Sequence, residues 1–209
     1  MDRKVGYQVR SKREGGTKRK IIETAILLFS EKSYNKVSTR DIAKLVGIRP
    51  ASLYSHFESK DDILEHIYKL YEEKIKNVLP DMNNLLSLAR TTHPHELLKR
   101  AQFFFDPADQ ELMDRIILIA SVESRTDERS AAFIDRNLIG NTGMITKTLL
   151  KRMLELGRIE PLDVDAFVTI VTNLSYSTAI RNFSKNPVGF YEWVRANDFL
   201  NELVRPTGA

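Results

Sequence analysis

Apolar residues recur three or four positions apart along most of the chain, which is the period of a helix with one buried face. The longest such run covers residues 127–156 and ends before a glycine at position 157. Prolines, glycines and short polar clusters interrupt the pattern near residues 80, 91–94, 106–107, 125–127, 157–161 and 186–187. No alternation of apolar and polar residues persists long enough for a strand, so the sequence predicts an all-α protein.

Residues 38–60 carry the most specific local signals, which predict two short helices joined by a tight turn. The first begins at Ser38, with Asp41 three positions later as its capping partner. Gly47 suits the end of this helix because glycine enters the left-handed conformation at little steric cost. Pro50 suits the first turn of the next helix, where its missing N–H leaves no bond unmade. The inward sides are expected to consist of Ile42, Ala43, Leu45 and Val46 in the first helix, and of Leu53 and Phe57 in the second.

A third helix is predicted to begin at about Ser59, where Asp62 completes a second capping pattern, and to continue toward Leu79. Two helices and a turn of about four residues match the helix-turn-helix unit. The outward side of the second helix carries Arg49, Ser52, Ser55 and His56, with Tyr54 and Lys60 at its flank. Side chains of these types contact bases and phosphates in DNA grooves. An αα-hairpin with a polar outer face and no DNA-binding role explains the same geometry.

The charge distribution favours the DNA-binding interpretation. Residues 1–60 contain 14 Lys and Arg against 6 Asp and Glu, whereas residues 61–209 contain 18 against 22, which gives +8 and −4. A basic N-terminal part joined to a mildly acidic remainder suits a protein that contacts a polyanion at one end. Residues 1–16 are expected to form a flexible basic arm that orders along phosphates or in a minor groove. A solubilising tail without contacts is the alternative.

Residues 18–64 resemble the DNA-binding domain of the TetR family of bacterial transcriptional regulators. The matching residues are Ile21, Ile22, Ala25, Leu28, Phe29, Tyr34, Val37, Ser38, Asp41, Ile42, Ala43, Val46, Gly47, Ile48, Leu53, Tyr54, Phe57, Ser59, Lys60, Asp62 and Leu64. The chain departs from the family pattern at Ser33, where glycine is usual. It also departs at residues 49–51, where small polar residues and glycine are more usual. Because this second departure lies on the predicted reading surface, the operator sequences of relatives do not transfer to this chain.

The resemblance implies three parts: a basic arm (1–16), a helix-turn-helix DNA-binding domain of three helices (17–62), and a helical ligand-binding and dimerisation domain (63–209). Carried over residue by residue, it implies that Thr39 and Arg40 approach phosphates. Bases would be faced by Arg49, Pro50, Ala51 and Ser52, and the DNA backbone would be held by Tyr54, His56 and Lys60. The implied partner is double-stranded DNA with a near-palindromic operator.

The family also implies a homodimer and a small-molecule inducer. The last two helices, about residues 163–184 and 187–204, have wide apolar faces that would pack against a second copy, although packing within one chain is an equal alternative. A dimer would place two reading helices in successive major grooves, about 34–36 Å apart. The inducer site is weakly defined; Phe104, Met113, Asn173 and Tyr176 are candidates, and the two polar ones could instead bond to a neighbouring helix.

Several classes of protein are disfavoured by what the sequence lacks. It contains no cysteine, and its apolar runs are far shorter than the ~20 residues that a membrane span needs, so a cytoplasmic location without membrane contact is expected. None of the four histidines has Glu three positions earlier, as di-iron bundles require. We therefore predict no catalytic residue, metal ligand or cofactor, and no enzyme. The remaining alternative is an architectural or division-related DNA-binding protein of the same fold that lacks an inducer.

Overall fold

The computed structural model describes residues 16–102, 105–181 and 190–208. Within these ranges the chain is helical or irregular, with an isolated β-bridge between Ile159 and Pro206 and no longer strand. The prediction of an all-α fold is confirmed. The predicted basic arm lies outside the described residues except for Gly16. None of the described helices is long and apolar enough to cross a bilayer.

The chain divides into two compact units, Met1–Lys69 and Leu70–Ala209. This division falls inside helix α4 (Lys60–Lys76) and therefore comes later than the boundary expected after residue 62. The structure thus assigns most of α4, including the buried Ile63, Leu64 and Ile67, to the N-terminal unit.

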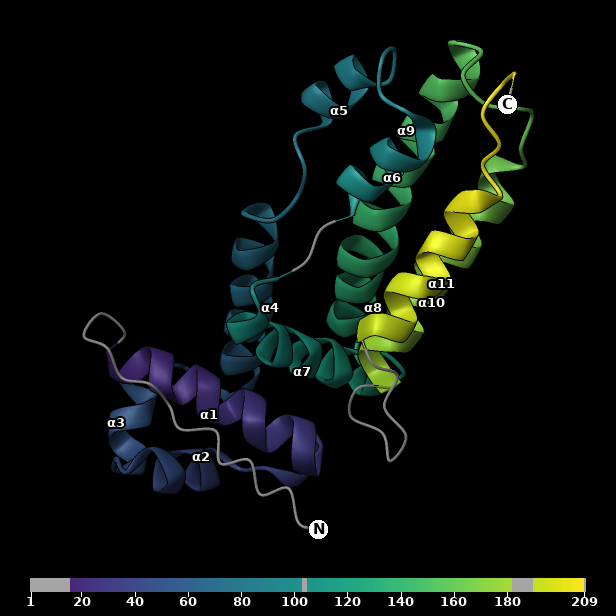
Figure 1. Ribbon diagram of the computed structural model, residues 1–209. Helices are drawn as coiled ribbons and strands as arrows, with labels where there is room; N and C mark the ends of the chain where they lie inside the picture. The colour runs from purple at the N-terminus through teal and green to yellow at the C-terminus, as the bar shows by residue number, and fades with distance from the viewer. Residues whose placement is uncertain (1–15, 103–104, 182–189, 209) are drawn as a thin grey trace. The chain divides into compact units, whose positions relative to one another are not determined.

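The N-terminal unit is a small helical domain in which α1 packs across α2, and α2 packs on α3 (Figure 1). Its elements are α1 (Thr17–Lys32), a 3-10 turn (Tyr34–Lys36), α2 (Thr39–Val46), α3 (Pro50–Tyr54) and the first part of α4. The core consists of fully or almost fully buried side chains that include Ile21, Ala25, Ile26, Phe29, Ile42, Ala43, Leu53, Phe57, Ile63 and Ile67. These positions recur at helical spacing, as the sequence pattern predicts.

One predicted core residue lies elsewhere. Leu45 is expected from the sequence on the inward side of α2, but 57% of its surface is exposed. At 100° per residue, Leu45 lies roughly 100° away from the centre of the face formed by Ile42, Ala43 and Val46. Because α2 is short and buries one narrow face, a residue that far round the helix stays outside the core.

The turn after α1 contains a backbone conformation that suits glycine. Ser33 has φ 74° and ψ 148°, and its N–H donates to Phe29 O at 3.0 Å to close the helix. This is the position at which the family pattern usually has glycine. A residue with a Cβ in such a sparsely populated φ/ψ region destabilises the folded state by about 1–3 kcal/mol.

Replacing Ser33 with glycine should therefore stabilise the N-terminal unit by about 1 kcal/mol, after the larger entropy of glycine in the unfolded chain is subtracted. Urea unfolding followed by circular dichroism measures the change. Gly47→Ala is the matched control: Gly47 has φ 81° with open space around its missing Cβ, and the substitution should cost about 1 kcal/mol. If Ser33→Gly is neutral or destabilising while Gly47→Ala behaves as expected, the strain at Ser33 is refuted.

The C-terminal unit continues from α4 with α5 (Met82–Leu88), α6 (Pro94–Ala101), α7 (Pro107–Glu123), α8 (Glu128–Ile134), a π-helical turn (Asp135–Gly140), α9 (Asn141–Glu155), α10 (Val164–Arg181) and α11 (Phe190–Glu202). The helix breaks predicted up to residue 161 are present, and the one at residues 186–187 lies outside the described residues. Helices α9, α10 and α11 lie side by side (Figure 1). At Gly143 a Cβ would come within 3.3 Å of Val168 Cγ1, so glycine permits the close packing of α9 on α10.

The run of residues 127–156 is one continuous helical segment with a π-helical turn in its middle. Gly140 closes this turn, and a Cβ there would lie 3.0 Å from Asp135 O. A π-helical turn shifts the register of the side chains that follow it and frequently occurs at functional sites. Here it directs the buried Asn137 and Leu138 into the interior of the unit.

Candidate nucleic-acid interface

The start of α2 is fixed by the predicted capping box. The Ser38 hydroxyl accepts a hydrogen bond from the Asp41 N–H at 3.2 Å, and the Ser38 N–H donates to Asp41 Oδ2 at 2.9 Å. The hydrogen bonds that Ser38 donates hold the pKa of Asp41 below its ordinary value. Both groups lie at the helix N-terminus, where a negative charge also meets the positive end of the helix dipole. Local sequence therefore sets where α2 begins.

The turn between α2 and α3 has the predicted geometry. The N–H groups of Gly47 and Ile48 both donate to Ala43 O at 3.0 Å, which satisfies the end of α2. Arg49 then occupies the N-cap position of α3, and Pro50 its first turn. The second helix ends at Tyr54, so the predicted extension to Phe57 is wrong. Leu53 of α3 and Phe57 after it are 0% and 1% exposed, and they anchor this segment to the core. The other face of α3 consequently points to solvent.

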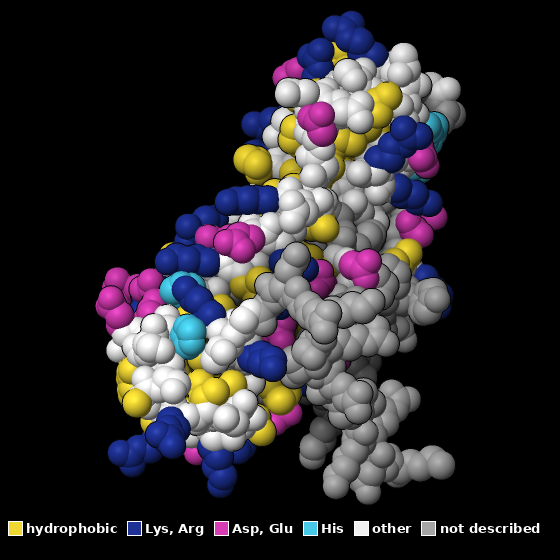
Figure 2. All heavy atoms as spheres, turned by 90° about the vertical axis from the view of Figure 1, so that its left-hand side faces the viewer, with side chains coloured by type: hydrophobic (Ala, Val, Ile, Leu, Met, Phe, Trp, Pro, Cys, Tyr) yellow, Lys and Arg dark blue, Asp and Glu magenta, His cyan; other side chains and the backbone are white. Residues whose placement is uncertain are grey.

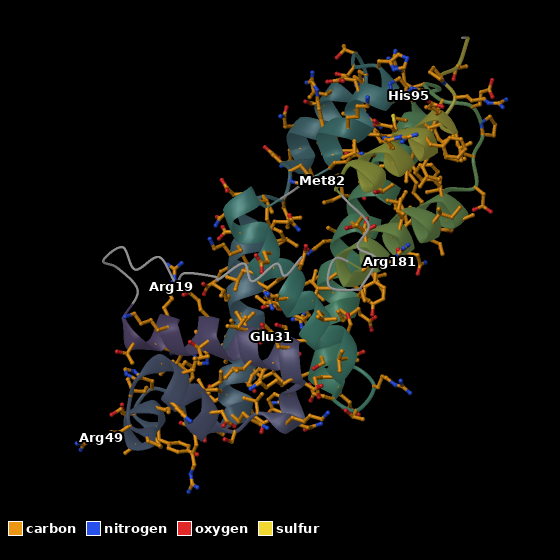
Figure 3. All side chains as sticks on the ribbon, turned by 60° about the horizontal axis from the view of Figure 1, so that its bottom comes forward. Arg19, Glu31, Arg49, Met82, His95 and Arg181 are labelled. Atoms are coloured by element: carbon orange, nitrogen blue, oxygen red, sulfur yellow. The ribbon has the colours of Figure 1, made fainter. Side chains whose placement is uncertain are left out.

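The outward face of α3, together with its flanking residues, displays most of the residues predicted to meet DNA. The side chains of Arg49, Pro50, Ala51, Ser52, Tyr54 and His56 are all exposed, as is Arg40 at the start of α2. Arg49 points away from the other helices of the unit (Figure 3). In the space-filling view, Lys, Arg and His side chains are prominent on the surface of this unit (Figure 2).

The structure also brings together two residues that are predicted to contact the DNA backbone from different helices. Thr39 Oγ1 and the Tyr54 hydroxyl are 2.9 Å apart, although 15 positions separate them in the chain. Tyr54 is 53% exposed, so this bond fixes an accessible group. A hydroxyl pair held at one place can donate to a phosphate oxygen without a further loss of rotamer freedom.

Lys60 has a role that the sequence does not reveal. Its ammonium donates to Tyr34 O and Val37 O, both at 3.1 Å, and lies 4.1 Å from the centre of the Tyr34 ring. These contacts join the N-terminus of α4 to the turn before α2. Two of the three N–H donors of the ammonium are thus used within the protein. Its predicted contact with the DNA backbone would depend on the third, so the main effect of losing Lys60 should be on folding.

Two short helices, a left-handed glycine turn and an outward polar second helix define the class of helix-turn-helix proteins.

Comparison with known proteins narrows this class. Residues 21–67 match the family profile described as bacterial regulatory proteins of the tetR family. The chain is 39% identical over 89 residues to IcaR of Staphylococcus aureus (strain Newman), the negative transcriptional regulator of the biofilm operon icaADBC. This match covers 43% of this chain and 44% of that protein. A shorter match to IcaR of Staphylococcus epidermidis is 52% identical over 46 residues and covers 22% of this chain and 25% of that protein. The N-terminal part of the chain, residues 21–67, therefore matches the DNA-binding domain of the TetR family.

Solved structures of transcriptional regulators share the fold of nearly the whole chain. PfmR from Thermus thermophilus is 25% identical, has a TM-score of 0.56, and the match covers 87% of this chain and 96% of that one. KstR2 of Mycobacterium tuberculosis has a TM-score of 0.60 at 18% identity, with 95% and 97% covered, and thus shows a common fold alone. The curated relatives, in contrast, are matched over less than half of their length. The names of these proteins as regulators agree with the prediction that the chain is not an enzyme.

The C-terminal unit contains a cavity of about 210 Å³ among α4, α6, α7, α9, α10, α11 and the π-helical turn. The apolar part of its wall includes Leu98, Ile117, Leu138, Ile145, Phe167 and Val171. The polar part includes Gln110, Asp114, Asn137, Thr142, Asn197 and Asn201. A cavity of this kind, apolar with a few polar groups, is the usual form of a small-molecule site.

Three of the four residues proposed from sequence for a ligand are absent from the described lining of this cavity. Met113 is fully buried, but it is absent from the described lining residues, as are Asn173 and Tyr176. Asn173 is exposed and its amide donates to Thr169 O of its own helix at 2.8 Å. Phe104 lies outside the described residues. The polar residues that do line the cavity come from several helices and the π-helical turn, and no local spacing in the sequence marks them as a group.

Proposed function

We propose that this protein is a homodimeric transcriptional repressor that binds a near-palindromic DNA operator and is released from it by a small molecule. The observation that carries the proposal is the exposed surface formed by α3 and the residues that flank it. Arg49 at the N-cap, Ser52 on the helix and His56 in the following turn are exposed, while Leu53 and Phe57 are buried. Arginine reads guanine through two hydrogen bonds in the major groove, and serine contacts several bases. Thr39, Arg40 and Tyr54 would bind the neighbouring phosphates.

The proposed dimer would form through α10 and α11. Both helices bury one side in the C-terminal unit, where Phe167 and Leu200 belong to its core. They also expose large apolar side chains, with Ile170 at 50% and Phe199 at 62%. Exposed apolar side chains on packed helices favour contact with another protein surface. A second copy is the occupant that a palindromic operator requires, because two reading helices must lie about one DNA turn apart.

Repression is favoured over activation by the relatives of the N-terminal part. IcaR is described as a negative transcriptional regulator, and the similarity covers 43% of this chain. The direction of regulation depends on where the operator lies relative to the promoter. By analogy with IcaR, we propose that this chain represses transcription by blocking it sterically at its operator.

Release by a ligand would use the cavity in the C-terminal unit. The cavity is lined in part by Tyr71, which belongs to α4, and α4 continues from the DNA-binding unit. A ligand shifts DNA affinity to the extent that it binds the free form better than the DNA-bound form, and typical couplings of about 1–3 kcal/mol give roughly 5- to 150-fold changes. The competing proposal is an architectural or division-related protein that responds to no small molecule.

Selection of bound sequences from random duplex DNA by the purified protein tests the proposal. The expected result is enrichment of one near-palindromic sequence, bound by two protomers. A metabolite library is then screened for compounds that release the selected duplex at constant salt. Enrichment without a releasing compound would favour the architectural alternative, whereas no enrichment at all would refute the repressor.

A further inference from the structure

The wall of the cavity contains a buried amide without a hydrogen-bond partner. Asn201 of α11 is 5% exposed and lines the cavity, and its Nδ2 is buried and unbonded in the part of the chain that the structure describes. Buried polar groups in folded proteins are almost always paired. An unpaired one costs free energy, because water solvates the same group in the unfolded chain. The unpaired donor of Asn201 therefore requires an explanation.

Other polar side chains of the same wall already have partners. Asn137 Nδ2 donates to Phe133 O at 3.1 Å. The hydroxyls of Ser175 and Thr178 donate to carbonyls of their own helix at 3.0 and 2.8 Å. A molecule in the cavity would compete with existing bonds at these donors. At Asn201 it would add a bond that the protein alone does not make.

The position of Asn201 is held by contacts between α6 and α11, which lie side by side (Figure 1). His95 Nε2 lies 2.8 Å from Val204 O, and Lys99 Nζ lies 3.6 Å from Asp198 Oδ1. These two contacts join α6 to residues on either side of Asn201 in the sequence of α11. Because the helix is held in place there, an acceptor for the amide has to come from the cavity.

The surroundings of Asn201 are apolar. Leu200 and Val204 flank it on α11 and belong to a buried cluster of the C-terminal unit. Leu98 and Phe167 belong to the same cluster and also line the cavity. The cavity of about 210 Å³ has the space of about seven water molecules in the liquid. A compact apolar body with one acceptor oxygen fits such a space.

We propose that the cavity binds a compact apolar ketone or ester, whose carbonyl oxygen accepts a hydrogen bond from Asn201 Nδ2. A carbonyl oxygen is an acceptor only, whereas a hydroxyl would bring a donor that needs a partner of its own. The inference rests on the proposed role of the C-terminal unit in binding an inducer, and it names the chemical class of that inducer.

Pairs of compounds that differ in one group test this preference on the full-length protein without DNA. The aromatic pair is acetophenone and α-methylstyrene, and the alicyclic pair is cyclohexanone and methylenecyclohexane. Within each pair the carbonyl oxygen is replaced by a methylene group of similar shape. Nuclear magnetic resonance titration, followed at the amide signals of the lining residues, gives the dissociation constants.

In at least one pair the ketone should bind about fivefold or more tightly than its alkene. The sign of the difference is informative, because a carbonyl group loses more hydration than an alkene on entering a cavity. Without a donor in the wall, the alkene would bind at least as tightly. The side-chain amide protons of Asn201 should also shift downfield with cyclohexanone and not with methylenecyclohexane.

Two variants assign the preference to Asn201. Asn201→Leu keeps the number of side-chain atoms and removes the donor, so the ketone should lose its advantage over the alkene. Asn173→Leu is the matched control. Asn173 is an exposed asparagine that is absent from the described lining and donates to Thr169 O of its own helix. This control should leave the preference for the ketone unchanged.

Thermal unfolding of the free protein tests the unpaired state of the amide independently of any ligand. Asn201→Leu should raise the unfolding temperature by roughly 2–4 °C, because it removes a buried donor without a partner. Asn137→Leu should lower the unfolding temperature, because the equally buried amide of Asn137 makes a hydrogen bond. A lower unfolding temperature for both variants would contradict the unpaired state of Asn201.

The outcomes separate this inference from the repressor proposal. If neither ketone binds more tightly than its alkene, or if Asn201→Leu leaves the preference unchanged, the ligand class is wrong even when the protein binds its selected DNA. If the ketone binds as described but does not release the DNA, the inference about the cavity stands and release by this class of ligand is refuted.

Discussion

Replacing Phe57 with alanine should unfold the N-terminal unit and abolish DNA binding. Phe57 is 1% exposed, and its ring packs edge to face on His66 at 5.1 Å, with Lys18 Nζ at 5.3 Å from its centre. Truncation of a fully buried phenylalanine costs about 3–5 kcal/mol, which is a large share of the stability of a small domain. Urea unfolding by circular dichroism and DNA binding by fluorescence anisotropy measure the two effects.

The neighbouring histidine supplies the control. His56 is exposed, so His56→Ala should leave the stability within about 0.5 kcal/mol of the parent protein while weakening DNA binding modestly. If Phe57→Ala retains both the stability and the DNA affinity of the parent, the packing described for this unit is incorrect.

Replacing Arg49 with alanine should relax base preference at one position of each half-site by about 1–3 kcal/mol. Arg49 is exposed at the N-cap of α3. In helix-turn-helix proteins the N-terminal residues of the second helix contact base edges in the major groove. Because a dimer carries two such residues, the loss for a symmetric operator is expected to be about twice as large. Competition between the selected duplex and single-base variants, measured at one salt concentration, gives the preference.

Arg40→Ala is the comparison for a phosphate contact. It should weaken binding to all duplexes alike and reduce the dependence of affinity on salt by about one unit of slope. Equal losses on every sequence for both variants, without a change in base preference, would contradict the assignment of Arg49 to the bases.

Local features of the N-terminal unit could be predicted from the sequence because their causes lie within a few residues. The bonds between Ser38 and Asp41 span three positions, and the glycine turn depends on the φ angle of Gly47. The burial of Leu53 and Phe57 was also predicted, although Phe57 lies beyond the end of α3 at Tyr54, so helical spacing does not explain its position. The resemblance of residues 18–64 to the TetR family made the same part of the chain recognisable, and the comparisons confirm it.

The internal contacts of Lys60 and the lining of the cavity could not be predicted from the sequence, because they depend on residues far apart in the chain. Lys60 bonds to carbonyls 23 and 26 positions earlier, so its internal role was hidden by its place at a helix N-terminus. The cavity brings Tyr71, Asp114 and Asn201 together from three helices. The wall of the cavity also includes residues of the π-helical turn, and the spacing of apolar residues in the sequence does not predict that turn. Met113 illustrates the difficulty, since an apolar residue at helical spacing packs in a core as readily as it lines a cavity.

Nuclear magnetic resonance tests directly whether α2 and α3 contact DNA. Isotope-labelled protein is titrated with its selected duplex while the backbone amide signals are recorded. We expect the largest shifts at the predicted DNA-binding residues Thr39, Arg40, Arg49, Ala51, Ser52, Tyr54 and His56, with smaller shifts elsewhere. Unchanged signals at these residues, with the largest shifts concentrated in the C-terminal unit, would contradict it.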